Sequence, residues 1–273
     1  MKKLLKRYVF WTYGVFYCFI LAIGIAMLVL KANTLAEILQ VISAWTATFV
    51  FIAMFHKIYP KDNLIQYITR QFSERIKIST VLCIILLQFF VFLGYILFTS
   101  SIRNVSIKSL LVTSWITWLV TFGDNLIRGP LGEELGWRGF VLNELQKKFN
   151  PLKSAIIVGA AWGFWHTPLW FLSGYSGIQL IEYITCFLIY IIAASVIMTV
   201  FYNWNHNLLI PIMIHQFFNY FVAIQAGDVL QNIMVTALLY FIVAVVLVLL
   251  NYKKCLYGKC VERAEEVFTK GNL

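Results

Sequence analysis

The residues of this sequence best suited to chemistry are ionisable and polar side chains set within long apolar stretches. They fall in three segments, PLGEELGWRGF at 130–140, WGFWHTP at 162–168 and NWNHNLLIPIMIHQFFN at 203–219. An ionisable group at membrane depth is costly unless it is paired, which makes such groups functional candidates. Each segment has a catalytic interpretation and a structural one.

The first segment carries two adjacent glutamates. A helix is predicted over 131–148, and on it Glu134 and Arg138 are four residues apart in the order that favours an ion pair. Glu133 is rotated from Glu134 by about 100°. It is therefore expected to stay free of this pair and to suit a general base. The structural alternative is that both acids complement the start of a helix at the cytoplasmic interface.

The second segment places His166 in a run without other charged residues from Lys153 to Glu182. It shares a helical face with Trp162, four residues earlier. Pro168 follows closely, so the backbone is expected to kink there. The alternative is an ordinary packing histidine that makes an interhelical hydrogen bond.

The third segment carries His215 and Asn219, again four apart and on one helical face, where both can address one small group. The alternative is polar contact between helices. Taken together, Glu133, His166, His215 and Asn219 on three apolar helices are expected to converge on one hydrated cavity within a helical bundle.

The elements that position these groups are predicted to lie in a membrane. Hydrophobic residues make up 61% of the 273 residues and charged residues 12%, which excludes an ordinary soluble domain. The expected fold is an all-α, polytopic, single membrane domain spanning 1–273. About eight transmembrane helices are expected, at 8–30, 36–55, 78–99, 110–127, 154–172, 178–202, 207–225 and 229–251.

The basic residues indicate the orientation. If the N-terminus is cytoplasmic, the external segments hold only Lys31, Arg103 and Lys108 of the 22 lysines and arginines. Both termini are therefore expected to be cytoplasmic in a multi-pass protein of the cell membrane, with 252–273 as a basic tail. The net charge of +10 is explained by this bias and by the lipid bilayer, and no nucleic-acid partner is expected.

These motifs resemble those of the CPBP family of intramembrane proteases, which includes type II CAAX prenyl endopeptidases and Abi-type proteins. The resemblance covers about 130–220. The Glu-Glu-x-x-x-Arg motif begins at Glu133, and the His-x-x-x-Asn motif runs from His215 to Asn219. The Phe-x-x-x-His motif ends at His166 and has Trp162 where Phe is usual.

The resemblance implies an intramembrane endopeptidase acting on a membrane-associated peptide or protein. Glu133 would activate water with help from His166, while His215 and Asn219 would stabilise the oxyanion. Glu134, Arg138 and Trp162 would support them. Two mechanisms are compatible with these residues. In one, Glu133, His166 and His215 hold a catalytic zinc ion. In the other, which we favour, the protein is a metal-free glutamate protease without a cofactor. The alternatives are a non-catalytic membrane regulator or bacteriocin self-immunity protein of the same family, and a proton-coupled transporter.

Overall fold

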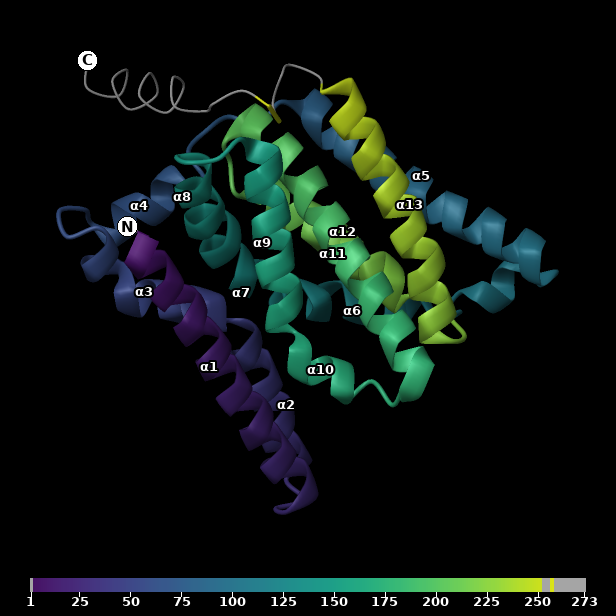
Figure 1. Cartoon of the computed structure of the whole chain (residues 1–273). Helices are drawn as coiled ribbons and strands as arrows, with labels where there is room; N and C mark the ends of the chain where they lie inside the picture. Colours follow the sequence, from purple (N-terminus) through teal and green to yellow (C-terminus); the bar gives the residue numbers. More distant parts are fainter. Residues whose placement is uncertain (1, 252–255, 258–273) are drawn as a thin grey trace.

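The computed structural model describes residues 2–251 and 256–257 (Figure 1). Every element in this part of the chain is a helix, apart from one isolated bridge between Leu111 and Gln225. The all-α prediction is confirmed, whereas the predicted basic tail falls almost entirely outside the described residues. The elements are α1 Lys2–Leu28, α2 Asn33–Ala44, α3 Thr46–Ile58, α4 Leu64–Arg70, α5 Ile78–Arg103, η1 Ile107–Leu110, α6 Trp115–Ile127, α7 Pro130–Glu134, η2 Leu135–Leu142, α8 Asn143–Gln146, α9 Pro151–Trp165, α10 Thr167–Phe171, α11 Gly177–Asn205, α12 Leu209–Ala223 and α13 Val229–Leu250.

In the part of the chain that the structure describes, four helices, α1, α5, α11 and α13, are long and apolar enough to cross a membrane. The pair α2 and α3, bent by 52° at its break, makes a possible fifth span. The chain is therefore a polytopic membrane protein. The expectation of eight full-length spans is wrong for the described residues, because α6, α9 and α12 have only 13, 15 and 15 residues. A complete crossing needs about 20.

Local features of the sequence mark where several of these helices begin or end. The side chain of Ser114 caps the first turn of α6, so the residues before it are not part of the helix. The predicted kink near Pro168 is confirmed, since α9 ends at Trp165 and α10 starts at Thr167. His206 takes a left-handed backbone conformation with φ of 46°, which ends α11 before α12 begins.

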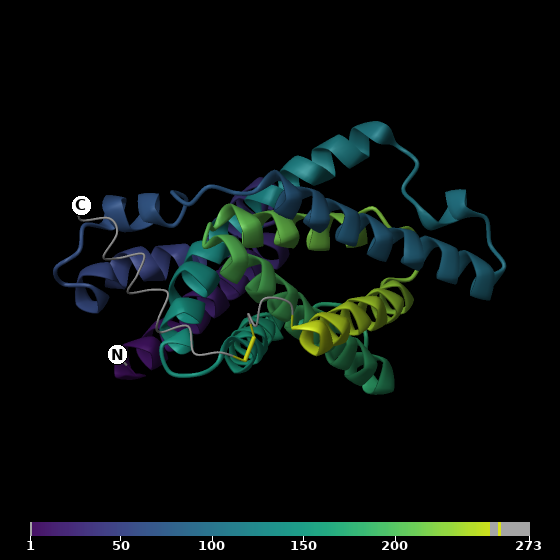
Figure 2. The same cartoon turned by 90° about the horizontal axis from the view of Figure 1, so that it is seen from above.

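The bundle has its densest packing around α11, which lies against α9, α12 and α13. In Figure 1, α1 and α2 run side by side and project from this body as a hairpin. Figure 2 shows α6 and α13 on opposite sides of the bundle. The short helix α7 lies inside, in contact with α3, α6 and α12, and this places the two adjacent glutamates in the interior.

The predicted helix over 131–148 is helical from Pro130 to Gln146, in three consecutive pieces. Its middle piece, η2, is a π-helix, a wider turn that often occurs at functional sites. The carbonyl oxygen of Gly139 accepts hydrogen bonds from the Tyr67 hydroxyl at 2.7 Å and from Asn143 Nδ2 at 2.9 Å. These side chains stabilise the part of the backbone where the helical pattern changes.

Candidate active site

The three motif segments meet in the interior from three different helices. The glutamates stand on α7 and Arg138 on η2, while Trp162 lies in the last turn of α9 and His166 caps its C-terminus. The third motif lies on α12, which packs against α7. The predicted convergence of the motif helices is therefore found, and the side-chain contacts below describe it.

Glu134 is the centre of a buried charged cluster. Its Oε1 accepts hydrogen bonds from Arg138 Nη1 at 2.9 Å and from His215 Nδ1 at 2.7 Å. The side chains of Glu134 and Arg138 are completely buried. The predicted ion pair is thus confirmed. Glu134 and His215 are 81 residues apart in the chain, so residue spacing did not predict their contact.

Glu133 lies outside the ion pair of Glu134 and Arg138, as expected, but it has a hydrogen-bond partner of its own. Trp162 Nε1 donates a hydrogen bond to Glu133 Oε2 at 2.5 Å, and both residues are buried. An indole N–H can only donate and a carboxylate oxygen only accepts, so the direction of this bond is unambiguous. The sequence indicates Trp162 as a supporting residue on the face of His166, but residue spacing does not indicate this contact with Glu133 on another helix.

His166 also binds Trp162, through the backbone. Its Nδ1 lies 2.8 Å from the carbonyl oxygen of Trp162. A carbonyl can only accept, so Nδ1 carries the proton, and in the neutral ring Nε2 is the acceptor. Within residues 2–251 and 256–257, no direct hydrogen bond joins Glu133 to His166, and Trp162 connects the two instead.

His215 and Asn219 come together beside Gly129, the residue before α7. A Cβ atom at Gly129 would lie 2.9 Å from Asn219 Nδ2 and 3.5 Å from His215 Nε2. A Cβ would crowd Asn219 Nδ2, while its distance to His215 Nε2 would be an ordinary contact, so the absence of a side chain at Gly129 makes room for Asn219. The two side chains therefore address one small region, as their spacing predicts, and Gly129 is a site residue that the sequence analysis did not identify.

Close backbone packing holds α7 and α9 in place. A Cβ at Gly132 would lie 2.7 Å from the carbonyl oxygen of Ala44 and 2.9 Å from Trp45 Cα, so α7 rests directly on the bend between α2 and α3. A Cβ at Gly159 would lie 2.9 Å from Ile192 Cα on α11. Small residues at such contacts let membrane helices approach closely. The glutamates and Trp162 thus stand on backbone that has little room to shift.

Whether the site residues could hold a metal depends on which of their donor atoms are already engaged. Among the residues that the structure describes, no three His, Cys, Asp or Glu side chains gather closely enough to hold an ion. His215 directs Nδ1 to Glu134, and Glu133 directs Oε2 to an indole N–H. These bonds and the bond from His166 Nδ1 to the Trp162 carbonyl leave Nε2 of both histidines and Oε1 of Glu133 available, so metal dependence stays a prediction. The reaction below is derived from the side chains alone.

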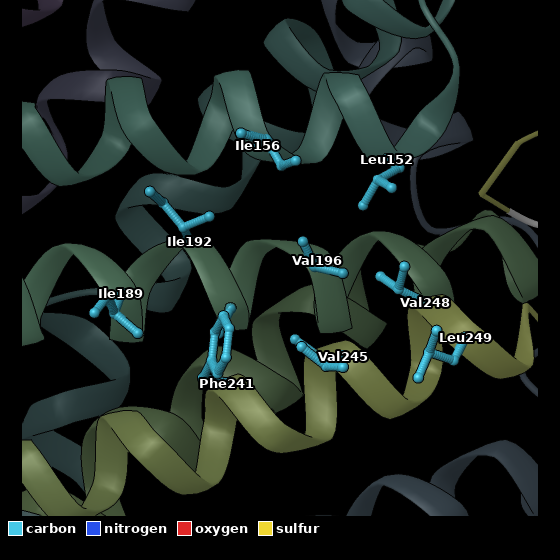
Figure 3. A pocket seen from close by; sticks show the side chains of 11 residues that line it. Leu152, Ile156, Ile189, Ile192, Val196, Phe241, Val245, Val248 and Leu249 are labelled. Carbon is cyan, nitrogen blue, oxygen red and sulfur yellow. The ribbon is translucent and has the colours of Figure 1, made fainter.

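Two cavities of the molecule lie away from the motif residues. The larger, an apolar groove of about 330 Å³, runs between α9, α11 and α13 (Figure 3). Its lining is aliphatic apart from Phe241, and it has no group that can transfer a proton. The smaller lies along α4. Neither borders Glu133 or His166, so the expected hydrated cavity at the site stays a prediction.

Two comparisons with known proteins bear on this site. Residues 113–221, which include all three motifs, match a family described as type II CAAX prenyl endopeptidase Rce1-like. A curated relative, CAAX prenyl protease 2 of Methanococcus maripaludis, is 44% identical over 41 residues. This second match covers 15% of the present chain and 15% of the relative.

Proposed function

We propose that the chain is an intramembrane endopeptidase, on the basis of the match of residues 113–221 to the Rce1-like family of type II CAAX prenyl endopeptidases. Its substrate is a membrane-associated peptide or protein with a CAAX-type end, and its location is the cell membrane with both termini cytoplasmic. The observation that carries the proposal is the meeting of Glu133, His166, His215 and Asn219 around Trp162 and Gly129, from three separate helices.

In the proposed reaction, Glu133 takes a proton from a water molecule as the water oxygen attacks the carbonyl carbon of the scissile bond. The carbonyl electron pair moves to its oxygen. When the tetrahedral intermediate collapses, the C–N bond breaks and the proton passes from Glu133 to the leaving amine. His166 supports this step with Nε2, which its bond to the Trp162 carbonyl leaves as an acceptor.

The oxyanion is stabilised from the side of Gly129. Asn219 Nδ2 is a donor in every protonation state of the site. His215 donates from Nε2 only when its ring carries two protons, because Nδ1–H is directed to Glu134. The Glu134 carboxylate supplies the counter-charge for that form. Asn219 is therefore the constant donor, and His215 contributes when it is charged.

Cleavage of defined peptides tests the proposal. We expect the purified protein in detergent micelles or lipid vesicles to cleave a fluorescence-quenched peptide that ends in a prenylated CAAX box, with mass spectrometry locating the cut bond. The unprenylated peptide shows whether the prenyl group is needed.

We further expect cleavage to survive exhaustive chelation. Activity restored only by added zinc would contradict the metal-free chemistry and leave the protease assignment intact, whereas cleavage of neither peptide would count against the protease itself.

Replacement of the oxyanion donor should affect the transition state more than substrate binding. We expect Asn219→Ala to lower kcat by about 10²–10³ with little change in KM, the range found when one oxyanion donor is removed. Steady-state kinetics on the peptide that the parent cleaves measures both constants. A variant that raises KM while kcat stays at the parent value would place Asn219 in substrate binding instead.

A further inference from the structure

Trp162 contacts three charged or ionisable groups of the site through different parts of one side chain. Its Nε1 donates to Glu133 Oε2 at 2.5 Å. The guanidinium carbon of Arg138 lies 4.2 Å from the centre of its ring, in a cation–π arrangement. The His215 ring meets it edge-on, with centroids 4.8 Å apart and planes at 76°. The positions of these three groups therefore depend on one indole, which is 1% exposed.

The hydrogen bond to Glu133 distinguishes the two oxygens of the carboxylate. In the part of the chain that the structure describes, the Trp162 N–H is the one hydrogen-bond donor to Glu133, and it binds Oε2. We propose that Trp162 is a positioning residue, whose N–H holds Oε2 and orients Glu133 so that Oε1 takes the proton from water. This inference rests on the proposed function. It identifies Glu133 Oε1 as the proton acceptor in the first step of the proposed reaction and Trp162 as the residue that orients it.

The N–H, rather than the ring, is the part of Trp162 that sets this orientation. A Phe at position 162 would keep a ring for Arg138 and His215 but has no donor. The backbone of α9 packs closely on α11 at Gly159, which limits how far it can shift to compensate. Trp162→Phe therefore removes the donor while keeping an aromatic ring.

The bond itself can be tested without any substrate. The full-length protein labelled with ¹⁵N-tryptophan has nine indole N–H groups, and Trp162→Phe identifies the signal of Trp162 by removing it. We expect Glu133→Gln to shift that signal upfield, because a neutral amide oxygen polarises the N–H less than a carboxylate does. Glu144→Gln, at a buried glutamate that instead binds Tyr59 and Lys147, should leave it in place. A Trp162 signal unchanged in Glu133→Gln would overturn the proposal.

The effect on catalysis is measured with the prenylated CAAX peptide. We expect Trp162→Phe to lower kcat by about 10- to 100-fold at unchanged KM, and thermal unfolding measures its effect on folding separately. Trp170→Phe is the matched control, because Trp170 is also buried and its Nε1 has no partner among the described residues. Wild-type kcat in Trp162→Phe would overturn the positioning role. If the parent protein cleaves neither peptide, the protease proposal fails, and the indole signal still decides whether the bond to Glu133 exists.

Discussion

Arg138→Ala is expected to cost about 3–5 kcal/mol of stability and to reduce the yield of folded protein, because it leaves Glu134 charged and buried without its cation. The pair is completely buried, so water cannot replace the lost guanidinium. The substitution also removes the group that stacks on Trp162. Thermal unfolding of the purified protein in detergent, followed by tryptophan fluorescence, measures the loss.

Arg128→Ala is the matched control for this change. Arg128 pairs with Asp124 at 2.6 Å, also four residues apart on a helix, but the two side chains are 30% and 51% exposed. An exposed pair of this kind contributes about 0.3–0.5 kcal/mol. Equal destabilisation by the two substitutions would mean that burial of the Glu134–Arg138 pair has no particular importance for the fold.

Composition and hydropathy were enough to predict a helical membrane protein, but not the positions at which its helices break. Hydropathy identified the apolar stretches, and the long helices α1, α5, α11 and α13 lie where they were expected. Hydropathy does not indicate where a stretch breaks unless a residue such as Pro168 marks the point. The bend at Trp45, between α2 and α3, has no such marker. It depends on tertiary contact, since α7 packs there through Gly132.

The site could be predicted where the contact is local. Glu134 and Arg138 lie on consecutive turns of one helix, so their spacing alone indicated the pair that the structure contains. The contacts of Glu134 with His215 and of Glu133 with Trp162 join different helices. Such contacts depend on how the helices pack and on which way a side chain turns, and neither follows from residue spacing. The catalytic roles of all four polar residues stay predictions.

Glu133→Gln should abolish proteolysis while leaving the protein folded, and this separates a protease from a non-catalytic membrane regulator. The amide has nearly the same shape as the carboxylate and its oxygen still accepts the Trp162 N–H, but it cannot take a proton from water. We expect kcat to fall by about 10²–10⁴, the usual contribution of a general base.

Glu144→Gln makes the same chemical change at another buried glutamate, whose Oε1 binds Tyr59 and Lys147. We expect this control to keep the parent kcat, so that any loss in Glu133→Gln reflects its position in the site rather than the removal of a buried carboxylate. Thermal unfolding of both variants measures folding separately from activity. If Glu133→Gln cleaves the peptide at the parent rate, the general base lies elsewhere. If it unfolds as readily as Arg138→Ala, Glu133 belongs to the structural charge cluster, and the division of roles between the two adjacent glutamates is wrong.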